Sequence, residues 1–213
     1  MKIIGLVLVM LFAMGGACMA AEATLDVYDG WNLIGVPLVP FNPDPYEVFS
    51  GRTVDYSLYR TDAEGNSFTL GIDDFGSILL GDGYYYYNSD GAGSINYQGV
   101  EDAVPGIDGP TDMWISLPGV KEDPNVNAGG WHMISCPFQH DVSVDQIYFT
   151  DGTELKSWND ASGAGWVEFI MWYYNDGLAP FNNEGWGDDD MMRAGRGYFF
   201  RTGKDDLAMI LKN

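Results

Sequence analysis

The chain has 213 residues, which is enough for one large domain or two small ones. Hydrophobic residues make up 46% and aromatic residues 15%, a composition that excludes an intrinsically disordered protein. The formal net charge of −21 argues against nucleic acid and anionic membrane surfaces as partners, because phosphate groups would be repelled.

The first twenty residues predict a secretory signal. Lys2 precedes an apolar run at 3–14, which is too short to span a membrane, and small residues follow it. No later stretch is long and apolar enough for a transmembrane segment, so we expect an extracellular or cell-surface protein. Cys18 leaves open a signal that ends in a lipid anchor. If residues 1–20 are removed, Cys136 is the one remaining cysteine and no internal disulfide can form.

The rest of the chain carries one pattern twice. GWNLIGVPL at 30–38 is matched by GWHMISCPF at 130–138, and GDGYYYY at 81–87 by GRGYFF at 195–200. Two further landmarks are aromatic pairs around a turn, namely Tyr59 with Phe68 and Trp158 with Trp166. Landmarks that recur in the same order predict an internal duplication.

The spacing of these landmarks predicts the domain boundaries. We expect a first copy at 24–100, a linker at 101–112 and a second copy at 113–213. The offset between the copies grows toward the C-terminus, which predicts an insertion within 167–194 of the second copy.

The landmarks resemble a module found in exported surface proteins of bacteria and archaea. That module opens on a GWN-x-I-x-x-P strand, passes through an aromatic hairpin and closes on a GYW-type strand. The chain departs from it at His132, in place of the asparagine, and at Tyr85 and Phe199, in place of the closing tryptophan. The resemblance implies an exported, non-catalytic β module.

Local patterns predict an all-β fold of two tandem antiparallel units, each a sandwich or small barrel. Short runs of Val, Ile, Tyr, Phe and Trp alternate with Asp-Gly turns, and no long stretch has helical periodicity. One helical turn is expected at 45–49, where Asp44 is a cap and Pro45 the first residue, with a counterpart at 143–149. A strand is expected at 113–117, directly after the linker.

His132, Cys136 and His140 are the candidates for a metal or nucleophile site. On one straight strand they would lie about 13 Å apart, too far to share a zinc ion. Cys136 also occupies the place that Val36 has in the first copy, which favours a core position.

The acidic residues suggest calcium, because many Asp residues sit beside Gly or Asn in turns. The candidate ligands form two clusters: Asn182, Asn183, Glu184, Asp188, Asp189 and Asp190; and Asp62, Glu64 and Asn66. Neither fits an EF-hand, and both are also explained as good turn formers. The aspartates at 188–190 have a further alternative, which is pairing with the nearby basic residues Arg193, Arg196, Arg201 and Lys204.

Aromatic side chains give the second functional indication. Alternation along 84–87 and 165–174 places aromatic residues on both faces of each strand. Either both faces are packed in a core, or one face is an exposed platform of the kind that holds sugar rings. The candidate platform residues are Tyr85, Tyr87, Trp166, Trp172 and Tyr174.

These observations lead to three expectations about function, in order. The first is an exported, non-catalytic structural protein that assembles with copies of itself into a larger extracellular structure. The second is a module that binds cell-surface polysaccharide through the aromatic platform. The third is a glycoside hydrolase, for which Glu168 within an aromatic strand is the most interesting carboxylate.

Overall fold

The computed structural model describes residues 20–101, 112–120, 129–173 and 191–213. The segments predicted as a secretory signal and as a linker lie outside these ranges apart from residues 20, 101 and 112. The described chain is all-β, and its strand pairings between named strands are antiparallel, which confirms the predicted class. No sheet in this part of the chain closes into a barrel. No helix among the described residues has the length and apolar character needed to cross a bilayer.

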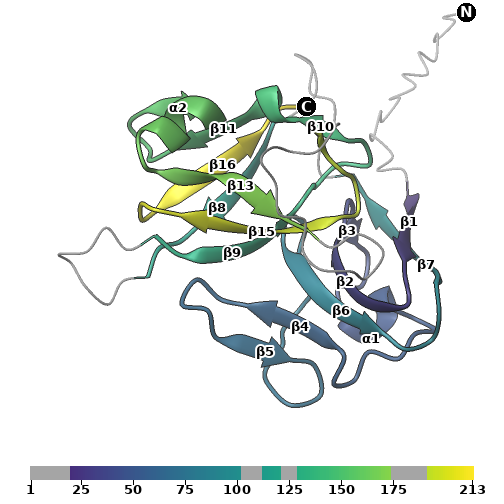
Figure 1. Cartoon of the computed structure of the whole chain (residues 1–213). Helices are drawn as coiled ribbons and strands as arrows, with labels where there is room; N and C mark the ends of the chain where they lie inside the picture. The colour runs from purple at the N-terminus through teal and green to yellow at the C-terminus, as the bar shows by residue number, and fades with distance from the viewer. Residues whose placement is uncertain (1–19, 102–111, 121–128, 174–190) are drawn as a thin grey trace, which may run out of the picture.

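The N-terminal half, purple to teal in Figure 1, contains two sheets. Its elements are β1 (Ala21–Val27), β2 (Gly30–Gly35), β3 (Val39–Pro40), α1 (Pro45–Val48), β4 (Leu58–Thr61), β5 (Ser67–Thr69), β6 (Gly83–Asn88) and β7 (Gly93–Val100). The strand orders are β1-β7-β3 and β2-β6-β4-β5. The Asp44 side chain accepts a hydrogen bond from the Tyr46 amide and caps α1, as predicted.

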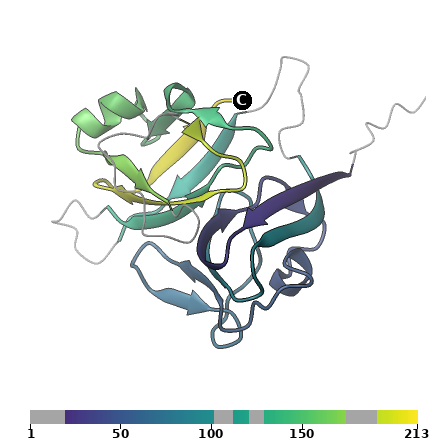
Figure 2. The same ribbon diagram turned by 45° about the vertical axis from the view of Figure 1, so that its right-hand side comes forward.

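The C-terminal half, green to yellow in Figures 1 and 2, lies beside the first. Its elements are β8 (Met113–Leu117), β9 (Trp131–Ser135), β10 (Val142–Ser143), the 3-10 turn η1 (Val144–Gln146), β11 (Ile147–Thr150), β12 (Leu155–Ser157), α2 (Trp158–Gly163), β13 (Val167–Trp172), β14 (Met191–Met192), β15 (Gly197–Thr202) and β16 (Leu207–Leu211). The strand orders are β12-β11-β16-β8, β13-β15-β9 and β10-β14. The strand predicted at 113–117 is confirmed, and the turn predicted after Ser143 is a 3-10 turn.

Each half has its own hydrophobic core. The first core takes its buried side chains from residues 23–97 and the second from residues 115–211. Tyr84 and Tyr86 are fully buried in the first, and Phe149, Trp158 and Phe200 are packed ring against ring in the second. The buried residues of the first core thus all precede those of the second along the chain, while the domain boundaries stay a prediction.

The central strands of the two halves share a register. Ile34 of β2 lies opposite Tyr84 of β6, and Ile134 of β9 lies opposite Tyr198 of β15. Each tyrosine hydroxyl accepts a hydrogen bond from the backbone amide five residues before it, at 2.8 Å for Tyr84 and 2.6 Å for Tyr198. These matches agree with the landmark pattern, while a duplication of the chain stays a prediction.

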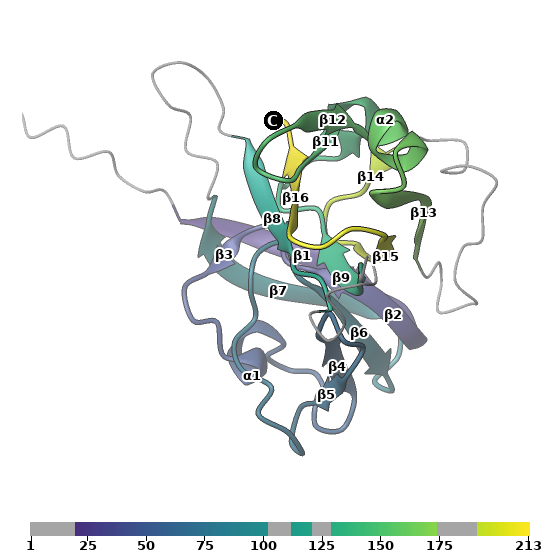
Figure 3. The same cartoon turned by 90° about the vertical axis from the view of Figure 1, so that its left-hand side faces the viewer.

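The halves meet through backbone contacts that are mirrored between them. The Gly35 amide donates to the Gly195 carbonyl at 3.1 Å, and the Ser135 amide donates to the Gly81 carbonyl at 2.8 Å. Isolated bridges add Ile34 with Arg196 and Asp82 with Ile134. Each contact from the first half to the second thus has a counterpart from the second half to the first, at the corresponding strand positions. This exchange is the pattern that an approximate twofold axis between the halves produces. Figure 3 shows β9 and β15 lying next to the first half.

The aromatic pairs around a turn, Tyr59 with Phe68 and Trp158 with Trp166, lie in different secondary structures in the two halves. In the first half, β4 and β5 form a hairpin with Arg60 opposite Phe68, as expected. In the second half, Ser157 caps a helix by accepting from the Asp160 amide, so Trp158 begins α2 instead of a hairpin strand. The residue that corresponds by register to Tyr59, opposite Tyr85, is Trp172, opposite Phe199.

The longer connection in the second half therefore precedes Met171. It contains β12 and α2, which have no counterpart between Phe49 and Leu58 of the first half. The sequence places the insertion later, within 167–194, and residues 174–190 of that interval lie outside the described part.

Candidate functional site

A continuous surface of aromatic rings crosses both halves and is called here the aromatic surface. Its members are Tyr87, Trp31, Tyr59, Tyr85, Phe199 and Trp131, with Trp172 opposite Phe199 on the neighbouring strand. Strand alternation builds it: Tyr84 and Tyr86 point into the core, so Tyr85 and Tyr87 point away from it. The predicted division of the tyrosine run between two faces is therefore confirmed.

Successive rings of this surface are in contact. The Trp31 ring centroid lies 5.2 Å from that of Tyr87, 5.6 Å from Tyr59 and 6.2 Å from Tyr85. Tyr85 then reaches Phe199 of the other half at 6.4 Å. These distances are those of ordinary edge and tilted aromatic pairs, so each ring is held in place by its neighbours.

The first half of the surface is hollowed into a shallow groove of about 330 Å³. The groove is lined by Trp31, Tyr59, Tyr85, Thr61 and Ser67, none of which carries a charge. The Thr61 hydroxyl is buried and has no hydrogen-bond partner among the described residues. The groove thus combines aromatic walls with the exposed Ser67 side chain, which is the mixture expected of a small-molecule or sugar site.

The second half of the surface is packed more tightly. Trp131 is stacked on Phe199 with ring centroids 4.6 Å apart, and the Arg201 guanidinium lies 5.8 Å from the Trp131 ring centroid. Arg201 also donates to the Glu168 carboxylate at 3.0 Å. Glu168, the carboxylate singled out by sequence, is therefore part of a surface ion pair beside the aromatic rings.

Trp166 does not belong to the aromatic surface. It is 9% exposed, and the Lys204 and Lys156 ammonium groups lie 4.2 and 4.8 Å from its ring centroid. The prediction of Trp166 as a platform residue is wrong because the turn after α2 packs its ring into the second core. Of the other predicted platform residues, Tyr174 lies outside the described residues.

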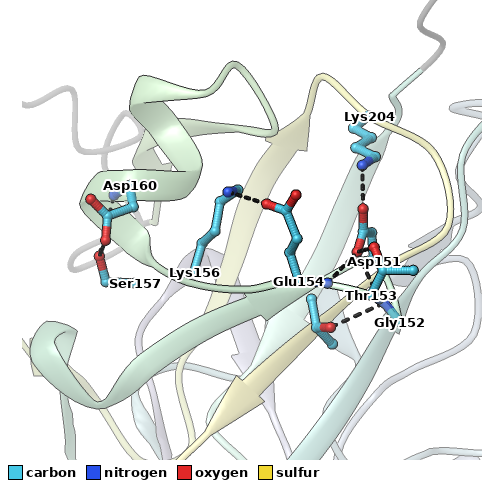
Figure 4. A network of polar contacts seen from close by, with 9 residues as sticks. Asp151, Gly152, Thr153, Glu154, Lys156, Ser157, Asp160 and Lys204 are labelled. Atoms are coloured by element: carbon cyan, nitrogen blue, oxygen red, sulfur yellow. Dashed lines mark hydrogen bonds and ion pairs between the residues drawn. The ribbon is translucent and has the colours of Figure 1, made fainter.

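The two lysines beside Trp166 are held by acidic residues of the β11–β12 turn, as Figure 4 shows. Lys204 donates to Asp151 at 2.6 Å and Lys156 donates to Glu154 at 2.5 Å. The hydrogen bond from the Lys204 ammonium is the largest cause that holds the pKa of Asp151 well below its usual range. Hydrogen bonds from the Glu154 amide and from the Thr153 hydroxyl and amide lower this pKa further. This network accounts for Lys204 without the aspartates at 188–190, which lie outside the described part.

The predicted calcium ligands fall into two groups. Asp62, Glu64 and Asn66 lie in the β4–β5 turn, where Asp62 accepts from the Asn66 amide at 2.8 Å and from its side chain at 2.9 Å. These contacts explain the cluster as a turn motif. The other ligands lie outside the described residues: Asn182, Glu184, Asp188, Asp189 and Asp190. Where residues are described, no group of three His, Cys, Asp or Glu could hold a metal ion, and calcium stays a prediction.

His132, Cys136 and His140 do not lie on one straight strand, because β9 ends at Ser135. The chain turns after β9, so the Cys136 thiol contacts the His140 carbonyl with Sγ 3.4 Å from the oxygen. Cys136 is fully buried, as predicted, and burial raises the pKa of its thiol to about 12. The His132 ring nitrogen pairs with Thr202 at 3.2 Å, and burial lowers its pKa to about 4.

A second cavity, of about 320 Å³, lies where the halves meet. Arg60, Thr61 and Asp82 line it from the first half, and Trp131 and His132 from the second. Burial raises the pKa of the Asp82 carboxyl to about 6, although the nearby Arg60 charge opposes this shift. We call this space the junction cavity.

Sequence reasoning found Tyr85, Tyr87 and Trp172 but missed the rest of the aromatic surface. Trp31 and Trp131 were available as a signal, since both head the repeated GW strands. They were interpreted as fold landmarks, and the contacts that join them to the tyrosine run come from strand pairing.

The described residues define an all-β protein with two cores and one aromatic surface that crosses both halves. Comparison of the chain with protein-family models, with curated proteins and with solved structures found no match. The likeness to exported surface modules therefore rests on the sequence landmarks.

Proposed function

We propose that this chain is an exported, non-catalytic surface protein that binds a neutral polysaccharide through the aromatic surface. The observation that carries the proposal is the groove of Trp31, Tyr59 and Tyr85, which is aromatic and uncharged in a chain of net charge −21. Sugar rings have apolar C–H faces that pack on aromatic side chains, and their hydroxyls would bond with the exposed Ser67 at the groove.

The charge of the chain favours a neutral ligand. A strongly acidic surface repels sulfated or uronate-rich polysaccharides, while the absence of charge among the five groove residues leaves no group to pair with an ionic sugar. A neutral, equatorially linked glycan such as cellulose or chitin fits both features, because its ring faces are apolar.

Replacing Trp31 with alanine is expected to weaken polysaccharide binding by about tenfold or more, since it removes the ring that contacts three other members of the surface. Depletion of the protein by insoluble cellulose and chitin measures this. Trp114→Ala is the matched control, because Trp114 is 62% exposed on β8 and is not a member of the surface. Wild-type protein that binds neither polymer, or W31A that binds like the wild type, would contradict the proposal.

Self-assembly is the second candidate function, and one observation favours it. β1 is a seven-residue edge strand of its sheet, paired with β7 on one side, and edge strands are templates for pairing with another copy. Light scattering of the chain from residue 21, with calcium and with chelator, tests both the assembly and the calcium prediction. If the chain assembles, we expect its mass in solution to exceed that of a monomer and to be larger with calcium than with chelator. A monomer under both conditions would reject assembly as the main role.

A further inference from the structure

We propose that the aromatic surface binds one extended polysaccharide chain across both halves of the protein, so that its ligand is a polymer segment and not a terminal sugar. This inference rests on the proposed function and specifies its ligand. The juxtaposition that carries it is the contact of Tyr85 with Phe199, at 6.4 Å, which joins the groove of the first half to the stacked Trp131 of the second.

The two parts of the surface are held next to each other by the backbone. The mirrored hydrogen bonds of Gly35 with Gly195 and of Ser135 with Gly81 bring together the beginnings of β6 and β15. Because both strands alternate with the same burial pattern, their outward side chains Tyr85 and Phe199 lie on the same side of the junction. An extended ligand that occupies the groove would therefore reach Phe199 and Trp131 of the other half without a change in protein conformation.

Strand register shows that the two halves contribute corresponding positions. Tyr59 opposite Tyr85 corresponds to Trp172 opposite Phe199. Trp31 opposite Tyr87 corresponds to Trp131 opposite Arg201. The surface consequently has two similar aromatic sets. The first set is Trp31, Tyr59, Tyr85 and Tyr87, and the second set is Trp131, Trp172 and Phe199. A ligand that covered one set alone would leave the other exposed to water.

The two sets differ in the polar groups that they offer. The first set includes tyrosines and lies beside Ser67, which is exposed at the groove. The second set has Phe199 in place of a tyrosine, with Arg201 half-exposed above Trp131. We assign hydrogen-bonding selectivity for the sugar to the first set, and additional stacking along the polymer to the second.

A length series tests this assignment. Titration calorimetry with β-1,4-linked glucose and N-acetylglucosamine oligosaccharides, from two to six sugars, is expected to show affinity rising about tenfold or more with length in one series. Trp131→Ala is expected to abolish most of this gain, and Trp172→Ala gives the same comparison if W131A fails to fold. Trp114→Ala is the control and keeps the full length dependence.

The outcomes separate the two proposals. Equal affinity for a disaccharide and a hexasaccharide would overturn the extended site while leaving polysaccharide binding intact. A length dependence that survives in both folded W131A and folded W172A would also overturn it. Absence of binding in both series, together with no retention on the insoluble polymers, would overturn the proposed function itself.

Discussion

Replacing Gly83 with alanine is expected to destabilise the protein by about 3 kcal/mol or more. A Cβ atom built on Gly83 would lie 2.7 Å from the Ile134 carbonyl oxygen and 3.0 Å from the Ile134 amide nitrogen. Both neighbours are backbone atoms, so no side chain can rotate away to make room. Gly197 is the counterpart in the second half, with its Cβ 2.7 Å from the Ile34 carbonyl oxygen, and Gly197→Ala should behave alike.

Urea denaturation followed by tryptophan fluorescence measures this effect. Gly163→Ala is the matched control, because nothing lies within 4 Å of its added Cβ at the end of α2. We expect this control to leave stability within about 0.5 kcal/mol of the wild type or to raise it slightly. A G83A variant as stable as G163A would show that the backbone contact between the halves does not exist in solution.

Replacing Asp82 with asparagine is expected to stabilise the protein near pH 7.5 and to have little effect near pH 3.5. The folded-state pKa of Asp82 is about 6, above the ordinary carboxyl value near 4, because burial disfavours its charge. Near pH 3.5 the carboxyl is mostly protonated in both the folded and the unfolded chain. As the pH rises toward 6 the unfolded chain loses this proton first, so the wild-type stability falls and the loss is complete above pH 6.

The expected difference at pH 7.5 is on the order of 2–3 kcal/mol in favour of D82N. Urea midpoints at the two pH values measure it. Asp29→Asn is the control, since it removes a carboxylate of the same kind from an exposed turn. An equal effect of D82N at both pH values, or a loss of stability at pH 7.5, would rule out a destabilising buried charge at the junction cavity.

Local signals in the sequence predicted the elements that local chemistry determines. Asp44 followed by Pro45 is enough to begin α1, and the strand at 113–117 has the alternation of a half-buried strand. The tyrosine run at 84–87 likewise divided between two faces as its period of two requires. These features depend on a few neighbouring residues and not on the rest of the fold.

Features that depend on tertiary pairing could not be predicted in this way. Trp158 and Trp166 flank a turn just as Tyr59 and Phe68 do, yet the cap at Ser157 makes the intervening segment a helix. The spacing argument for Cys136 and His140 assumed a straight strand, whereas the chain turns after β9. The aromatic surface combines side chains of several strands, and only their pairing brings these side chains together.

The separation of the two cores along the chain has a consequence for synthesis. The first core is complete once residue 97 is available, and β7 closes it by pairing with β1. The second must wait for the last strand, because β8 pairs with β16 at the C-terminal end. We therefore expect the N-terminal half to fold while the other half is still emerging. During that interval the Ile34 backbone, later covered by Gly197, is the surface on which the second half assembles.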